Sequence, residues 1–103
     1  MKLTQIKGIA HDLAYHLDFQ ILFGDFKNLS IPKESIRDIL KPKSAFDKHC
    51  LEFFKKRLPK SFDFKRITEL LITIHRSMTS VSIKIKVKVD DKEFSFSNKS
   101  IMS

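Results

Sequence analysis

The stretch VSIKIKVKVDDKEFSF, residues 81–96, decides the fold. Branched apolar residues alternate with serine and lysine from Val81 to Val89, and phenylalanine alternates with serine after Asp90-Asp91. A period of two is typical of a strand that buries one face. Two aspartates between two such runs indicate a tight turn. The stretch therefore predicts an antiparallel β-hairpin.

The two-residue loop also predicts how the two strands pair. It sets residues of matching character opposite each other: Lys88 with Glu93, Val87 with Phe94, and Ile85 with Phe96. A shift of one residue would mix apolar and polar side chains on both faces. One face of the hairpin therefore needs a core, and the other shows lysines to solvent.

Length and composition predict one globular domain over residues 1–103, with 42% hydrophobic residues and ten phenylalanines. The single cysteine, Cys50, cannot form an internal disulfide, and the pattern of a signal peptide is absent from the first residues. Both features predict a reduced, cytoplasmic protein. The apolar runs are far shorter than the roughly 20 residues of a membrane span, so no membrane partner is expected.

An amphipathic helix is predicted from about Thr4 to Phe23. Its apolar stripe recurs every three or four residues: Leu3, Ile6, Ala10, Leu13, Leu17 and Ile21. Gly24 follows, where a left-handed C-terminal cap would favour glycine. Three other large residues lie on a different side of this helix: Tyr15, Phe19 and Leu22. They indicate a second contact surface, within the domain or with a second subunit.

Two shorter helices are predicted after a loop over residues 25–31. Pro32 suits a first helical turn, and Ile36, Ile39 and Leu40 then precede Pro42, which would end this helix.

The next helix is predicted to begin after Ser44, which has the side chain of an N-cap and is followed three residues later by Asp47. It should end before Pro59, and its last turn is basic, which suits the helix dipole.

Residues 62–78 carry conflicting signals. Their apolar residues fit one face of a helix, but five of the ten residues from Ile67 to Arg76 are isoleucine or threonine, which favours a strand. We favour a strand within Leu70–Arg76, and we expect residues 98–103 to fray. The fold class predicted is α+β, with an N-terminal helix, two shorter helices and a C-terminal hairpin that a third strand extends.

Positive charge is the main functional signal, with a formal net charge of +8. Residues 31–66 hold eleven basic and five acidic residues, including a basic cluster interleaved with Phe62 and Phe64: Lys55, Lys56, Arg57, Lys60, Lys65 and Arg66. Such a cluster can neutralise phosphates and offer rings for base stacking, although both rings also suit a core. The predicted hairpin adds a row of lysines spaced about 7 Å apart: Lys84, Lys86 and Lys88. Solvation of a helix end and of a sheet face would also account for these charges.

Signals for catalysis are weak. His11-Asp12 lacks the further ligands of a metal site, and His49-Cys50 are helix neighbours whose side chains diverge, so Cys50 is expected in the core. The motifs GxGxxG, GxxxxGK[ST], HExxH and GxSxG are all missing from the sequence. The surviving enzymatic hypothesis is a metal-free ribonuclease of toxin type centred on His75-Arg76.

The sequence thus favours a small, non-enzymatic binding module without a cofactor or a metal. Nucleic acid is the leading partner, through the basic cluster and the hairpin lysines. A protein-interaction module that forms a homodimer is the alternative, and the ribonuclease is the second alternative.

Overall fold

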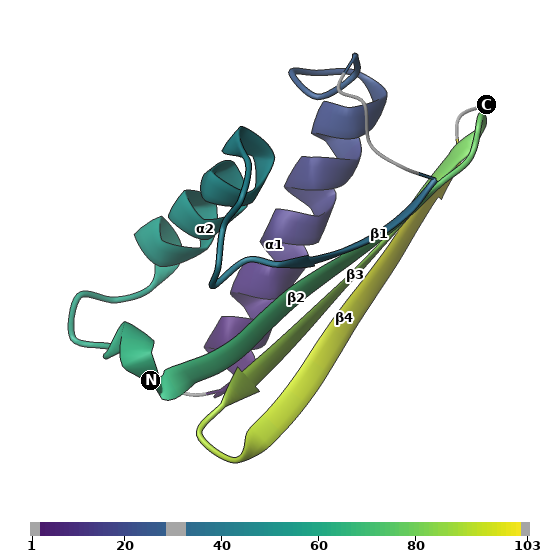
Figure 1. Cartoon of the computed structure of the whole chain (residues 1–103). Helices are drawn as coiled ribbons and strands as arrows, with labels where there is room; N and C mark the ends of the chain where they lie inside the picture. The colour runs from purple at the N-terminus through teal and green to yellow at the C-terminus, as the bar shows by residue number, and fades with distance from the viewer. Residues whose placement is uncertain (1–2, 29–32, 102–103) are drawn as a thin grey trace.

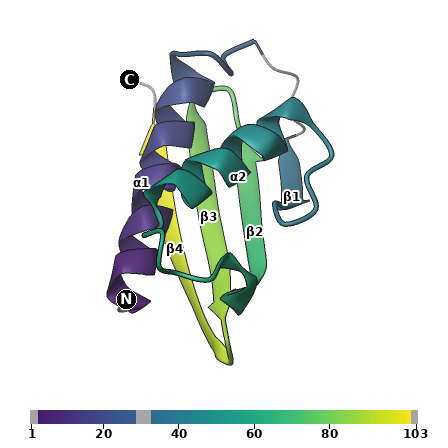
Figure 2. The same ribbon diagram turned by 90° about the vertical axis from the view of Figure 1, so that its left-hand side faces the viewer.

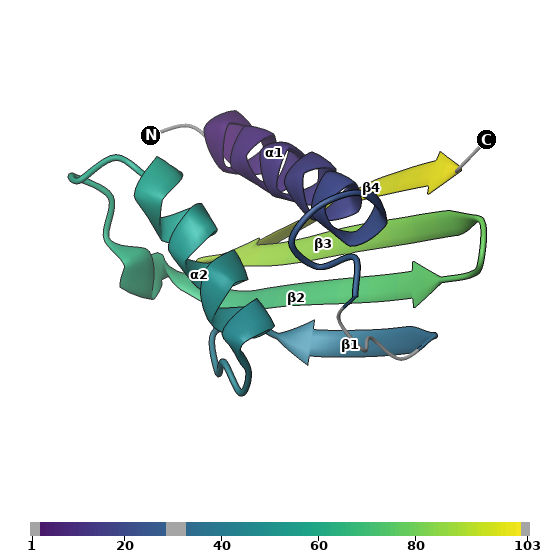
Figure 3. The same ribbon diagram turned by 90° about the horizontal axis from the view of Figure 1, so that it is seen from above.

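The computed structural model describes residues 3–28 and 33–101 and has an α+β fold (Figure 1). Its elements are listed in chain order: helix α1 (Leu3–Leu22), strand β1 (Glu34–Asp38), helix α2 (Ala45–Arg57), the short 3₁₀ helix η1 (Phe64–Arg66), and strands β2 (Ile67–Arg76), β3 (Ser80–Val89) and β4 (Lys92–Ile101). The strands form one antiparallel sheet in the order β1-β2-β3-β4. Helices α1 and α2 cover the same face of the sheet, and no helix of the described residues lies on the opposite face (Figures 1 and 3).

Strand β3 lies at the centre of the hydrophobic core. Its alternating apolar residues are each at most 1% exposed: Val81, Ile83, Ile85, Val87 and Val89. The apolar stripe of α1 packs over β3 and β4, and all its predicted members except the partly buried Leu3 are buried. Figure 2 shows α1 along the β4 side of the sheet, with α2 beside it. The predicted first helix is therefore confirmed.

The hairpin register is confirmed. Lys88 pairs with Glu93, and the two apolar pairs follow it on the helix-covered face. Asp90 has a φ of 54°, in the left-handed region that a tight two-residue loop requires and that aspartate tolerates better than most residues. The pair Asp90-Asp91 is thus the turn that the pattern predicted.

The predicted strand in residues 62–78 is also confirmed, and it is longer than expected. Strand β2 runs from Ile67 to Arg76 and pairs with β3 along most of its length. The helical spacing in this segment is therefore misleading. The alternating residues Leu70, Ile72 and Ile74 are completely buried, so the β-branched residues pack under the helices as strand residues do.

The short helix predicted between Pro32 and Pro42 is wrong, because its described residues contain strand β1; Pro32 itself lies outside the described residues. Without β1, the backbone amides and carbonyls on the outer edge of β2 would lack partners. Strand β1 pairs with that edge and supplies them. After the strand, the Ile39 amide still donates to the Leu70 carbonyl at 2.9 Å. The apolar residues of this segment do not share one helical face, since Ile36 points outward at 72% exposure while Ile39 is buried.

A buried ion pair holds β1 against the second helix. Arg37 of β1 donates to the Asp47 carboxylate of α2 at 3.1 Å, and Asp47 is only 4% exposed. The same carboxylate accepts the Lys43 amide at 3.0 Å. The predicted N-cap is confirmed, because the Asp47 amide donates to Ser44 Oγ at 3.1 Å. The contact between Arg37 and Asp47, ten positions apart, overrides the weak helical pattern of the segment that forms β1.

The frayed tail predicted over residues 98–103 is wrong for residues 98–101, which belong to β4; residues 102–103 lie outside the described residues. Asn98 donates to the Asp18 carboxylate of α1 at 3.0 Å, and the Ser100 hydroxyl donates to the same oxygen. Asp18 is 5% exposed. Two hydrogen bonds to a buried carboxyl group therefore hold the described end of β4 on α1.

The left-handed cap predicted at Gly24 is also wrong, because no described glycine has a positive φ. A Cβ atom at this position would instead collide with the side chain of Gln20. That side chain folds over the helix end and accepts the Asp25 amide at 2.7 Å. Gly24 thus provides space for a side-chain cap.

We predict that Val87→Asp abolishes cooperative unfolding, because it places a charge on the completely buried face of β3 at a cost above about 3 kcal/mol. Lys84→Asp on the exposed face of the same strand is the matched control and should change the free energy of unfolding by less than about 1 kcal/mol. Urea denaturation followed by circular dichroism measures both. A parental transition in the Val87 variant would show that the assigned face is wrong.

Candidate nucleic-acid interface

The basic cluster occupies one end of the molecule. Its residues lie in the last turn of α2, in the following loop and in η1, next to the start of β2 (Figure 1). All six cationic residues are exposed. Asp63 is the single acidic residue within this segment, and its carboxylate is already used to cap η1, accepting the Lys65 amide at 3.0 Å. The segment therefore presents a concentrated positive surface.

A shallow pocket of about 340 Å³ opens among these cations. Its lining combines basic, apolar and aromatic residues: Lys55, Lys56, Leu58, Pro59, Lys60, Phe62 and Phe64. Both phenylalanines are partly buried and pack against the core, so each ring is held rigidly while part of it reaches the pocket. The Lys55 ammonium lies 4.7 Å from the centre of the Phe64 ring. The pocket thus places cations beside fixed aromatic rings, as sites for single-stranded nucleic acid do.

Three of the six cations already have partners. Arg66 donates to both Asp90 oxygens, with its Nη2 at 2.8 Å, and this hydrogen-bonded ion pair raises the pKa of Arg66 and lowers the pKa of Asp90. The guanidinium carbon of Arg57 lies 3.6 Å from the centre of the Phe53 ring, and the Lys55 ammonium lies over the Phe64 ring. Within the described residues, the other three members of the cluster form neither an ion pair nor a cation–π contact: Lys56, Lys60 and Lys65. These three lysines are the most available for a phosphate.

The hairpin lysines lie on the face of the sheet opposite to the one that α1 and α2 cover, since they alternate along β3 with its buried residues. Lys86 is held between Glu69 and Glu93, at 3.9 and 3.5 Å. Lys84 and Lys88 form no ion pair in the described part of the chain. Register places further acidic residues on this face: Glu34 and Asp38 of β1. The two groups of predicted site residues therefore sit on different surfaces, and the sheet face has a more balanced charge.

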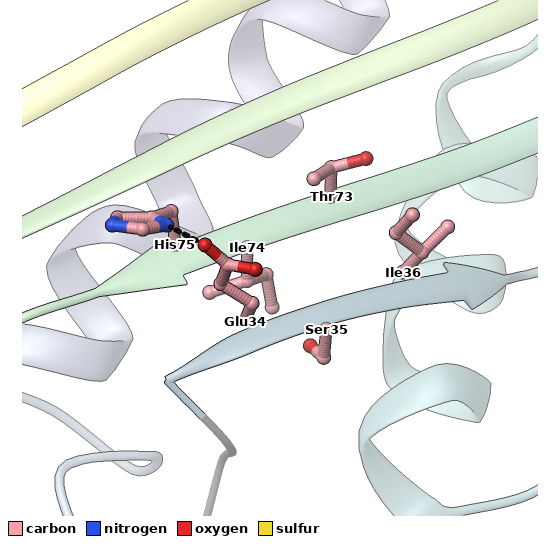
Figure 4. Close-up of a pocket in the computed structure, with 6 residues that line it drawn as sticks. All are labelled: Glu34, Ser35, Ile36, Thr73, Ile74 and His75. Atoms are coloured by element: carbon pink, nitrogen blue, oxygen red, sulfur yellow. Dashed lines mark ion pairs between the residues drawn. The ribbon is translucent and has the colours of Figure 1, made fainter.

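The two residues of the ribonuclease hypothesis point to opposite faces of β2. On the open face, the imidazole Nδ1 of His75 lies 3.1 Å from the Glu34 carboxylate, beside a pocket of about 550 Å³ between β1 and β2 (Figure 4). Arg76 instead contacts the carbonyl of Lys27 at 3.4 Å. Because adjacent strand residues alternate between faces, Arg76 cannot serve as a phosphate clamp for His75.

Cys50 is completely buried on the inner side of α2. Burial, with a smaller effect from Asp47, raises the pKa of its thiol to about 12. Since the thiolate is the nucleophile, this thiol is unreactive at neutral pH, as its position in the apolar stripe predicted.

A histidine pair between the two helices escaped the sequence analysis. His16 of α1 and His49 of α2 lie with their Nε2 atoms 2.8 Å apart, and Phe53 stacks on His16 at 4.7 Å. Burial lowers the pKa of His16, and the nearby His49 and Arg57 lower it further. Nothing in the linear sequence signals this contact, because 33 positions separate the two residues. Within residues 3–28 and 33–101, no three His, Cys, Asp or Glu residues gather to hold a metal ion.

We predict that the melting temperature falls as the pH drops below about 6.5, the ordinary pKa of histidine. The unfolded chain then takes up a proton that His16 of the folded chain resists, so acid favours unfolding. His16→Gln should reduce this pH dependence between pH 7.5 and 5.5, whereas His11→Gln on the same helix should retain it. Calorimetry at several pH values measures the slope, and an unchanged slope in the His16 variant would contradict the assignment.

Comparison with family models, with curated proteins and with solved structures found no match. None of the described helices is long and apolar enough to cross a membrane. Any functional assignment therefore depends on the surfaces of this chain alone.

Proposed function

We propose that the chain is a small cytoplasmic protein that binds nucleic acid, with the basic cluster on the phosphate backbone. One observation carries the proposal: the cluster presents six exposed cations, and three of them, Lys55, Lys56 and Lys60, line a pocket with two fixed phenylalanine rings. Phosphate contacts supply most of the affinity of non-specific nucleic-acid binding. A net charge of +8 would also attract the polyanion over a distance.

Within this proposal the residues divide by chemistry. Lys56, Lys60 and Lys65 neutralise phosphates, since they exchange solvent for phosphate without first leaving an acidic or an aromatic partner. Phe62 and Phe64 offer ring surface to an unstacked base at the pocket, which favours single strands over duplex. The hairpin lysines contribute less, because Lys86 would have to leave two carboxylates.

We predict that changing Lys56, Lys60 and Lys65 together to Gln weakens binding to all sequences by about tenfold or more and flattens its salt dependence. Each lost phosphate contact lowers the slope of log K against log salt by about 0.7 to 0.9. Fluorescence anisotropy with labelled single- and double-stranded DNA and RNA, at about 50 and about 200 mM salt, measures both effects.

The matched control removes the same charge from the sheet face, as Lys84, Lys86 and Lys88 to Gln. Both variants have a net charge lower by three, so a general loss of positive charge would weaken them equally. A larger loss in the cluster variant supports the proposed interface. Equal losses, or parental binding by the cluster variant, would contradict it. Parental melting of both variants excludes unfolding as the cause.

A second proposed function is protein–protein interaction, with another copy of the chain as the partner. Large aromatic residues are exposed along one side of α1 and just after its end: Tyr15 at 50%, Phe19 at 59% and Phe23 at 61%. Apolar side chains of this size that share one side of a helix are typical of an interface. Only Leu22 of the residues expected on this second side of the helix is buried within the chain.

A further inference from the structure

We propose that two copies of the chain pair antiparallel through β4, about a two-fold axis at Phe96, and so form a continuous eight-stranded sheet. The inference rests on the second proposed function and adds the surface, the register and the partner. Its first support is that β4 is an edge strand of ten residues, paired only with β3 among the described residues. Its pairing with β3 runs without a register shift, and it contains no proline. It therefore lacks two of the devices by which edge strands avoid pairing, a proline and a β-bulge.

Hydrogen bonds inside the sheet identify which backbone groups of β4 are free. Leu70 and Arg76 of β2 bond toward β1, so the odd-numbered residues between them bond toward β3. Their partners in β3 are even-numbered, as in the pair Thr73 and Lys84. The odd-numbered residues of β3 consequently bond to β4, where their partners are even-numbered, as in Ile85 and Phe96. The odd-numbered residues of β4 therefore direct their amides and carbonyls to the open edge: Glu93, Ser95, Ser97, Lys99 and Ile101.

Charge then selects one register for a second copy. An axis at Phe96 pairs Ser95 with Ser97 of the other copy and Glu93 with Lys99, and both pairs join odd-numbered residues with free backbone groups. The two symmetry-related Glu93–Lys99 pairs lie on the open face of the sheet, and opposite charges in such positions are stabilising. An axis at Ser97 would instead set Glu93 against Ile101 and leave Lys99 opposite serine. The strand is thus complementary to itself at Phe96.

The helices fit the same register. Because α1 packs on both β3 and β4, and strands lie about 4.8 Å apart, joining two β4 strands puts the two α1 helices about 10 Å apart. This is the distance at which helices pack, about 8 to 10 Å. The ring of Phe96 already lies 4.6 Å from His11 and 6.4 Å from Tyr15 of α1. The axis would therefore bring the half-exposed rings of His11 and Tyr15 against the same residues of the second copy, so that strand and helix contacts form together.

The test exchanges charge at the two ends of the pairing. Glu93→Lys sets lysine opposite Lys99, and Lys99→Glu sets glutamate opposite Glu93, so each variant should raise the dissociation constant of the dimer about tenfold. The double variant Glu93→Lys/Lys99→Glu restores opposite charges and should dimerise like the parent. A mixture of the two single variants should form a heterodimer, since both of its pairs are again opposite. Analytical ultracentrifugation measures the dissociation constants. It is done at about 150 mM salt, which screens the repulsion between two chains of charge +8.

A backbone variant gives an independent readout. Ser97→Pro removes an amide that faces the open edge and none that bonds to β3, so it should abolish the dimer and keep the parental circular dichroism spectrum. The expected mass of the parent is about 24 kDa, twice the 12.1 kDa of one chain, and that of the proline variant is 12.1 kDa. A parent that remains monomeric at millimolar concentration overturns this inference and the second proposed function together. A dimer that tolerates all these substitutions overturns pairing through β4 and leaves self-association in place.

Discussion

The structure depends on keeping one face of β3 away from water. Its five apolar side chains are at most 1% exposed and lie within a four-stranded sheet. Without a second layer, a sheet would leave this apolar face exposed to solvent. Two helices on the same side meet this requirement, with α1 over β3 and β4 and α2 alongside (Figure 2). The opposite face can then carry lysines and carboxylates, because nothing has to pack on it. The charged surface of the sheet thus follows from the one-sided core.

Two buried carboxylates tie the helices to the two edges of the sheet. Asp47 joins α2 to β1 through Arg37, and Asp18 joins α1 to β4 through Asn98 and Ser100. Burial raises the pKa of Asp18, while the hydrogen bond from Asn98 opposes this shift. Each contact is specific in direction and distance, which apolar packing is not. The carboxylates therefore fix where the edge strands lie under their helices.

Sequence reasoning succeeded where the pattern was local. Patterns among neighbouring residues were sufficient to predict the hairpin, its register, the first helix and the Ser44 cap. The β-branched residues also correctly favoured a strand in β2. It failed at β1 and at the end of β4, since both are held by partners far along the chain, such as Asp47 for Arg37. The candidate site shows the same division: the run of cations was visible, whereas its ion pairs and the His16–His49 contact needed the fold. Local propensity is a weak signal wherever a distant contact is stronger.

The contact between α1 and β4 also bears on how the chain is synthesised. The four strands form a meander, so each can join its predecessor as it leaves the ribosome. Helix α1 leaves before all of them, yet its apolar stripe packs on β3 and β4, and Ser100 lies 82 positions beyond Asp18. Most of the stability of a helix in a protein comes from the packing of its apolar face, which α1 lacks until those strands have formed. Of the described elements, α1 is thus translated before the strands that it packs on, and until they form its apolar stripe is open to chaperones.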